Sequence, residues 1–303
     1  MGKVGLTGKS FLPLLSGYAC AIPGVMATRT INSAKERLLT ILVLPWTSCS
    51  ARLPVYVILV PLLIGGSVAQ GAFMFGIYAL GTITAFGAAW LLGKRIGRSE
   101  PPASFLLELP PYRVPDFGYV GRQVLDRTLA FLKKAGTVIL GLSILLWALS
   151  TYPKAPSGDD KDQFSYSVMG RIGDTIEPLV APLGWDGRMG TAVLSSFAAR
   201  EVFVTSMAIS YAIDEDDEEF DSKLRDTLAE ATRTDGTKAY TPMVLLSLLI
   251  FFIYALQCLP TTAVVQRETR SWKWALGQLA GMSIFAYLAA MLVYQAGRLL
   301  GYS

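Results

Sequence analysis

Long apolar segments constrain this 303-residue chain more than any other feature. A helix needs about 20 mostly apolar residues to cross the hydrocarbon core of a bilayer. Residues 72–93 carry no charge and end at Lys94 and Arg95, which is typical of a span with a basic stop. The sequence predicts further spans over residues 38–64, 135–150, 242–259 and 275–297. We therefore expect an all-α, polytopic transmembrane protein.

Composition supports this interpretation and excludes several functions. Charged residues make up 17% of the chain, against about 25% in ordinary soluble domains. The absence of His excludes a Ser-His-Asp triad and a His-liganded zinc site. Three Cys do not form a disulfide framework, and a net charge of +4 is too small to indicate nucleic-acid binding. We expect no catalytic residues, no nucleic-acid partner, and the lipid bilayer as the main surroundings.

Basic residues predict the orientation, because short loops rich in Lys and Arg stay in the cytoplasm. The basic segments 27–37, 94–134 and 266–273 are therefore placed inside. The number of crossings between the first and last of them must be even. Four predicted spans lie between them, so residues 189–213 cross either zero or two times. This predicts a re-entrant hairpin, or two half-helices broken at Ala199-Arg200-Glu201, with the break lining a cavity.

Several segments are expected to lie outside the bilayer core. Residues 101–117 are Pro-rich and are predicted to be an irregular cytoplasmic loop. Residues 119–134 form an amphipathic pattern, which predicts a helix along the inner membrane surface. Residues 151–188 are predicted to be an external loop. Residues 214–239 begin with a dense acidic run and are interpreted as a solvated loop. The alternative, which we favour less, is a pore mouth that attracts cations.

Two stretches repeat at matching spacing. Cys20 is followed by Arg29, Ser33 and Lys35, and Cys258 is followed by Arg267, Ser271 and Lys273, at +9, +13 and +15 in both cases. A weaker match joins residues 48–52 to residues 196–200. Repeated halves with broken helices are typical of transporters. The alternative is convergent use of Pro and Arg at the ends of spans, and we favour the repeat.

The three thiols are candidate metal ligands. Cys20, Cys49 and Cys258 all lie in Pro- or Ser-flanked breaks, and none lies in an uninterrupted span. A helix-breaking Pro leaves carbonyl groups free to coordinate, and thiolates with oxygen donors suit a borderline metal such as ferrous iron. The alternative for each Cys is a small buried apolar side chain. The residues expected to support these breaks are Pro23, Pro260, Ser48 and Arg200.

Glu201 is the fourth candidate ligand. It is an ionisable residue inside an apolar segment, which is by default a hypothesis for a functional site. The alternative is that Arg200 and Glu201 mark a helix end near the membrane interface. We favour the functional interpretation, with Glu201 on a transient metal path.

Several longer motifs resemble one known family. They include Gly17-Tyr18-Ala19-Cys20-Ala21-Ile22-Pro23, Pro45-Trp46-Thr47-Ser48-Cys49-Ser50-Ala51-Arg52, Glu108-Leu109-Pro110-Pro111-Tyr112-Arg113, Ala199-Arg200-Glu201-Val202 and Gln257-Cys258-Leu259. Together they resemble the bacterial ferrous iron transport protein B family, in the same order and over nearly the whole chain. The resemblance implies a multi-pass importer of Fe²⁺ in the inner membrane, with Fe²⁺ as substrate and no permanently bound cofactor.

The resemblance also implies a domain organisation. It places Cys20 in a first gate module within residues 1–98, with Cys49 nearby. Residues 99–134 form a cytoplasmic loop and helix, and Cys258 belongs to a second gate module within residues 135–303. The family's GTP-binding domain is not in this sequence, which implies a truncated chain or half of a split system. Expected partners are a separate GTPase, a small accessory protein of the iron system and further copies of the chain.

Two other functions stay open at this point. The gate modules of the family are related to those of nucleoside transporters, so the chain could carry a nucleoside-like or other organic solute. It could also be a membrane scaffold that assembles with a separate GTPase and transports nothing itself.

Overall fold

The computed structural model describes residues 6–96, 116–153, 166–198, 200–211, 213, 220–232, 236–256 and 258–301. Helices dominate these segments, and none of them forms a β-strand; an isolated bridge joins Thr232 and Lys238. The predicted all-α class with broken helices is confirmed. The α-helices are α1 (Phe11–Ala19), α2 (Ala21–Ala27), α3 (Ala34–Val43), α4 (Leu53–Leu63), α5 (Ser67–Ile96), α6 (Phe117–Phe131), α7 (Thr137–Thr151), α9 (Val168–Val180), α10 (Gly187–Ser195), α11 (Val202–Ser210), α12 (Phe220–Glu230), α13 (Pro242–Tyr254), α14 (Leu259–Thr269) and α15 (Trp272–Leu299).

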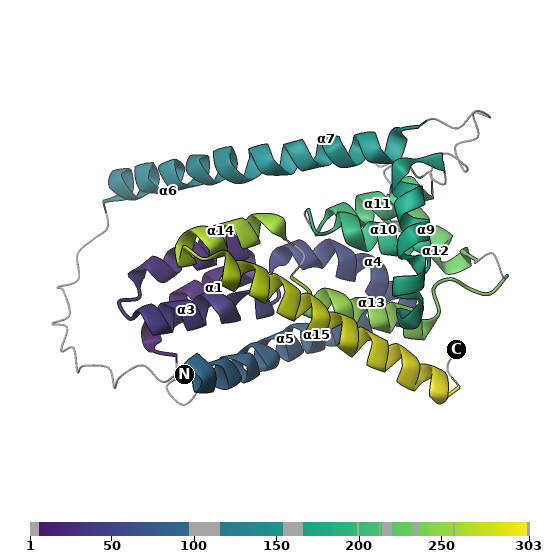
Figure 1. Cartoon of the computed structure of the whole chain (residues 1–303), viewed down its shortest axis with the longest axis horizontal. Coiled ribbons are helices and arrows are strands. Elements are labelled where there is room, and N and C mark those ends of the chain that lie inside the picture. The colour runs from purple at the N-terminus through teal and green to yellow at the C-terminus, as the bar shows by residue number, and fades with distance from the viewer. Residues whose placement is uncertain are drawn as a thin grey trace.

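Within the described residues, four stretches are long and apolar enough to cross a membrane: residues 34–63, 67–95, 242–269 and 272–299. Two of them are the continuous helices α5 and α15, which cross the lower part of Figure 1. The other two are composite. One joins α3 to α4 through short 3₁₀ turns, and the other joins α13 to α14 through a break at Cys258.

The segments predicted as a surface helix and a separate short span form one rod. A π-helical turn (Leu132–Gly136) joins α6 directly to α7, and the two run end to end along the upper edge of Figure 1. No proline interrupts the sequence between them. At 1.5 Å per residue the rod is about 50 Å long, which exceeds the hydrocarbon thickness of about 30 Å. The predicted surface helix and the predicted span are therefore parts of one continuous helix.

Two segments interpreted as loops contain helices. Helix α9 lies within residues 151–188 and packs against α10, with Gly173 so close that an added Cβ would meet the Gly187 carbonyl oxygen at 2.9 Å. Helix α12 lies within residues 214–239 and buries Leu224 and Leu228 against α4. The acidic run 214–219 and nearly all of the Pro-rich loop 101–117 lie outside the described residues.

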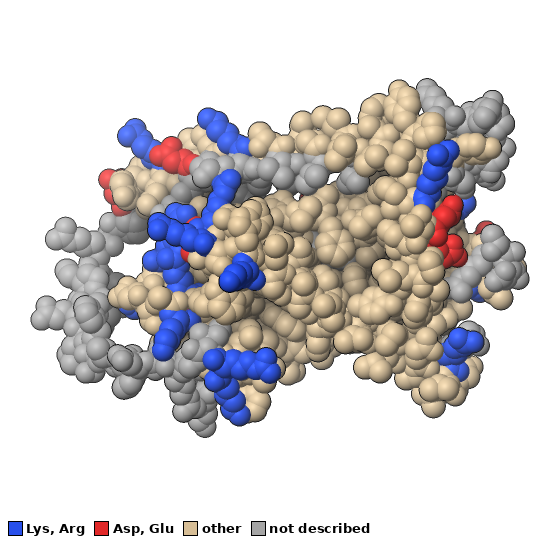
Figure 2. Space-filling model, viewed as in Figure 1, with Lys and Arg blue, Asp and Glu red and all other residues tan. Residues whose placement is uncertain are grey.

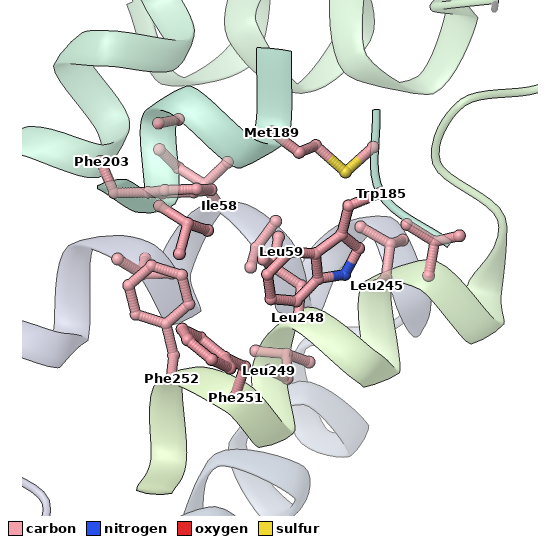
Figure 3. Close-up of a cluster of buried hydrophobic side chains, with 14 of the residues drawn as sticks. Ile58, Leu59, Trp185, Met189, Phe203, Leu245, Leu248, Leu249, Phe251 and Phe252 are labelled. Atoms are coloured by element: carbon pink, nitrogen blue, oxygen red, sulfur yellow. The ribbon is translucent and has the colours of Figure 1, made fainter. Parts of the chain in front are cut away.

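The larger core lies where α4, α10, α11 and α13 meet (Figure 3). Trp185 packs edge-on to Phe251 with ring centroids 5.1 Å apart, and Phe203 packs on Phe252 at 4.8 Å. Lipid is as apolar as these side chains, so close packing rather than exclusion of water stabilises such contacts within a bilayer. This core holds the second half of the chain against α4.

The first half has a smaller apolar core, and its first two helices also approach the backbone of the next turn closely. Gly17 on α1 and Gly24 on α2 both face the fully buried Leu44, and an added Cβ would lie 2.7 Å and 2.9 Å from its Cδ2 atom. Because neither glycine has a side chain, the α1–α2 hairpin seats directly on the 3₁₀ turn that follows α3.

Basic side chains gather at one end of the molecule (Figure 2). At that end Glu268 accepts hydrogen bonds from Arg29 Nε at 3.0 and 3.1 Å and forms an ion pair with Arg37 at 2.5 Å. The hydrogen bond to Glu268 raises the pKa of Arg29. The loops 27–37 and 266–273, predicted to lie on the same side, are therefore in contact.

Candidate metal-permeation site

Four helix starts converge on one part of the molecule. Cys20 directly precedes α2, Cys49 precedes the 3₁₀ turn Ser50–Arg52, Glu201 precedes α11, and Cys258 precedes α14. Each candidate ligand chosen from the sequence is thus the N-cap residue of a helical segment. The positive end of a helix dipole favours a negatively charged thiolate or carboxylate at such a position.

Prolines explain two of the breaks. Pro23 lies in the first turn of α2 and Pro260 in the first turn of α14. A proline is tolerated there but cannot continue a preceding helix, because it has no N–H group to donate. The backbone at Cys20 and Cys258 is accordingly extended, with φ of −157° and −160°.

The breaks are tied together in pairs by hydrogen bonds. In the first half, Ser50 Oγ donates to the carbonyl oxygen of Ala19, at 2.7 Å. This contact joins the break at Cys49 to the break at Cys20. The weaker repeat, which matches residues 48–52 to residues 196–200, did not predict this contact between the two breaks of the first half.

In the second half the pairing is an exchange of helical hydrogen bonds. A continuous helix would bond the Leu259 N–H to the Ala255 carbonyl. Here the Leu259 N–H donates to the carbonyl of Phe197 at 3.0 Å, and Arg200 Nη2 donates to the carbonyl of Ala255 at 2.8 Å. Two broken helices therefore satisfy each other's backbone groups.

All four candidate ligands line one cavity of about 160 Å³. The residues around it are Ala19, Cys20, Ala21, Ile22, Pro45, Thr47, Cys49, Ala51, Ala198, Arg200, Glu201, Leu256, Cys258, Pro260 and Thr261. Two of the predicted supporting residues lie elsewhere. Pro23 is exposed and is not part of the cavity lining, and the fully buried Ser48 accepts a hydrogen bond from Arg52 Nη1 at 3.0 Å.

Within the described residues, the four candidate ligands line the cavity without forming a closed coordination site. The three thiols are partly buried, while Glu201 is exposed. Thr261 Oγ1 donates to Cys258 Sγ at 3.1 Å, so this sulfur already accepts a hydrogen bond. Among the described residues no three His, Cys, Asp or Glu side chains are grouped closely enough to hold a metal ion together.

Sequence reasoning missed the residues that position the ligands. Ser50 and Thr261 were not selected, although both are hydroxyl residues next to a candidate Cys in a helix start. A hydroxyl one to three residues after such a Cys is the signal that could have found them. The carbonyl groups of Phe197 and Ala255 carry no sequence signal.

Comparisons with known proteins agree with this architecture. A family model described as "Nucleoside recognition", the gate model, matches residues 1–62 and 132–272, which include all four candidate ligands. The fold and the paired helix breaks therefore define a membrane protein of the gate class. A second model, described as "Ferrous iron transport protein B C terminus", matches residues 74–127. The chain belongs to the ferrous iron transport protein B family.

Curated relatives match along the whole chain. A protein of Leptospira biflexa named "Fe(2+) transporter FeoB" is 40% identical over 100% of this chain and 45% of its own length. One of the same name from Methanocaldococcus jannaschii is 36% identical over 99% of this chain and 43% of its own length. A Porphyromonas gingivalis protein, named a fusion of Fe(2+) transport protein A and the transporter, is 34% identical over 98% of this chain and 39% of its own length. The chain thus spans less than half the length of these relatives. No solved structure gave a significant match.

Proposed function

We propose that this chain forms the pathway by which a membrane transporter carries Fe²⁺ into the cell. The observation that carries the proposal is the cavity, where three thiols and a carboxylate from four separate helix starts converge. The relatives that match over the same residues are named Fe(2+) transporters. This name does not favour an organic solute as the substrate.

The donor set suits a borderline divalent metal. Thiolates bind ferrous iron well and bind magnesium or calcium poorly, since those ions prefer oxygen ligands. A pathway must also release its ion, so a few ligands of moderate affinity serve it better than a complete cage. Cys20, Cys49, Cys258 and Glu201 would each contribute to such transient binding.

The wider assembly follows from the same family. We propose that the chain lies in the inner membrane as a multi-pass protein and works with a GTPase domain. The natural fusion in Porphyromonas gingivalis supports a small accessory protein as a further partner.

The test is uptake of radioactive Fe²⁺ by cells that carry the complete system and no other ferrous importer. Cys20→Ser and Cys258→Ser should each lower the initial rate, since a serine hydroxyl is a far weaker ligand for ferrous iron than a thiolate. Ser247→Ala is the matched control, because this buried hydroxyl bonds the Leu183 carbonyl and does not line the cavity. Normal Fe²⁺ uptake by both Cys variants would contradict a pathway that depends on the thiols.

A second measurement separates a pathway from a scaffold. The purified chain alone is reconstituted into liposomes that contain an iron-sensitive dye. Influx of Fe²⁺ that depends on Cys258 supports a pathway. Influx that appears only when a GTPase partner is added, and that Cys258→Ser leaves unchanged, supports the scaffold.

A further inference from the structure

Each proline at a break leaves one backbone carbonyl without its helical hydrogen-bond donor. For two of these carbonyls a side chain from elsewhere in the chain donates instead. A proline cannot donate to the carbonyl four residues earlier. The carbonyl of Ala19 loses its donor in this way and accepts Ser50 Oγ at 2.7 Å instead. The carbonyl of Ile41 likewise accepts Gln278 Nε2 at 3.2 Å.

The third freed carbonyl has no substitute donor within the described residues. It belongs to Leu256, four residues before Pro260, and no described residue donates a hydrogen bond to it. The groups on either side are satisfied: the Ala255 carbonyl accepts from Arg200, and the Cys258 carbonyl accepts from the Thr262 N–H at 3.3 Å. Leu256 is only 1% exposed. An unsatisfied buried carbonyl is destabilising, and such groups are rare in native proteins.

The residue that carries this carbonyl is part of the cavity lining. Leu256 lines the cavity together with Cys258, and one residue separates them in the chain. We propose that the Leu256 carbonyl oxygen is a ligand of the transported metal, next to the Cys258 sulfur. This inference rests on the proposed function. It adds a backbone oxygen to a cavity whose acidic and thiol side chains alone do not complete a metal site.

The binding step balances simply. The Cys258 thiol loses its proton to solvent as the metal–sulfur bond forms, and the divalent metal keeps its oxidation state. The carbonyl oxygen donates a lone pair, so no covalent bond breaks at Leu256. A hard oxygen beside a soft sulfur favours borderline ions such as ferrous iron over purely thiophilic ones.

The test makes the Leu256 carbonyl oxygen a weaker metal ligand and leaves the rest of the cavity unchanged. An α-hydroxy acid at position 257 turns the amide after Leu256 into an ester, whose carbonyl oxygen is a poorer donor. Lactic acid at 257 is compared with Gln257→Ala, which has the same side chain and keeps the amide. Mn²⁺ and Cd²⁺ are titrated into the purified full chain in lipid nanodiscs. The ester should lower the Mn²⁺ affinity several-fold and leave the Cd²⁺ affinity nearly unchanged, because sulfur dominates cadmium binding.

Two further variants control for fold and for backbone chemistry. Leucic acid at 256 makes the Ala255 carbonyl an ester instead, and that oxygen is already occupied by Arg200. Pro260→Ala returns an N–H that can donate to the Leu256 carbonyl, and it should also lower the Mn²⁺ affinity. Pro178→Ala is its matched control, since this proline lies within α9 and outside the cavity lining.

The outcomes separate this inference from the proposed function. Equal Mn²⁺ affinity for the ester and amide at 257, with Pro260→Ala equal to wild type, overturns the carbonyl ligand. Cd²⁺ binding that Cys258→Ser leaves unchanged overturns the thiol pathway itself.

Discussion

The two halves of the chain build the same kind of broken-helix pair in different ways. In the first half, buried Arg52 serves its own break: it donates to Ser48 Oγ at 3.0 Å and to the Pro45 carbonyl at 3.3 Å. In the second half, Arg200 serves the partner break and donates to the Ala255 carbonyl. In the first pair the arginine thus bonds within its own break, and the hydroxyl of Ser50 joins the two breaks. In the second pair the arginine itself bonds across to the other break. The cavity lies between them, and Arg200 lines it whereas Arg52 does not.

The largest expected effect distinguishes the two arginines. Arg52→Leu removes two hydrogen bonds from a fully buried guanidinium, and Arg200→Leu removes one. Hydrogen bonds to charged groups contribute about 1.5–3 kcal/mol each, and desolvation of the charge offsets part of this. We expect Arg52→Leu to lower the free energy of unfolding by about 3 kcal/mol and Arg200→Leu by about half of that. Denaturant titration in detergent measures both.

Metal binding should reverse this order. Arg200→Leu releases the Ala255 carbonyl and loosens the break that positions Cys258, so Cd²⁺ affinity should fall. Arg52→Leu should leave Cd²⁺ affinity close to wild type, provided that the protein folds. Equal losses of affinity in the two variants would show that the halves do not differ in this way.

The next effect concerns the hairpins that carry the two thiols. Hairpin α1–α2 combines apolar packing with two close glycine contacts, whereas α13 packs through aromatic rings. Gly24→Ala would place a Cβ 2.9 Å from Leu44 Cδ2 and 3.0 Å from the Pro13 carbonyl oxygen. We expect a loss of about 2 kcal/mol, as is usual for overpacked cores. Gly76→Ala on α5 is the control, because nothing lies within 4 Å of its added Cβ. A Gly24→Ala variant as stable as the control would show that the hairpin is loosely seated.

A smaller effect tests how the halves are joined. Glu268 at the end of α14 bonds Arg29 and Arg37 from the first half. Glu268→Gln should lower the free energy of unfolding by about 1 kcal/mol, since Arg29 is largely exposed and solvent screens its charge. The loss should shrink in high salt. A double-mutant cycle with Arg37→Gln measures the coupling, and a coupling near zero would mean that the halves are not joined at this end.

Part of this architecture could be predicted from the sequence. The spans near 72–93 and 275–297 are long charge-free segments, and a bilayer leaves such segments few alternatives to a helix. The break at Arg200 and Glu201 could be predicted because these two residues interrupt an apolar run. Helix α12 could not, because Leu224 and Leu228 indicate a helix only once α4 is known to cover them.

The candidate site shows the same division. The thiols and Glu201 could be selected because ionisable and thiol side chains are rare in apolar segments, and the structure brings all four to one cavity. Their role in iron transport stays a prediction. Ser50 could not be selected, because its role depends on the Ala19 carbonyl, which needs a donor. Leu256 could not be selected, because its proposed role depends on its own carbonyl, to which no described residue donates.

The smallest change in stability tests the difference between the two break pairs most directly. Ser50→Ala removes the donor to the Ala19 carbonyl, which costs about 1 kcal/mol of stability. Ala19 lines the cavity, so its freed carbonyl would make the first break resemble the second, where the Leu256 carbonyl is open. We therefore expect Mn²⁺ affinity in nanodiscs to rise several-fold in Ser50→Ala and to stay unchanged in Ser247→Ala. If Ser50→Ala binds Mn²⁺ no better than wild type, an open carbonyl at a break is not sufficient to bind metal, and the second pair must owe its role to the position of Cys258.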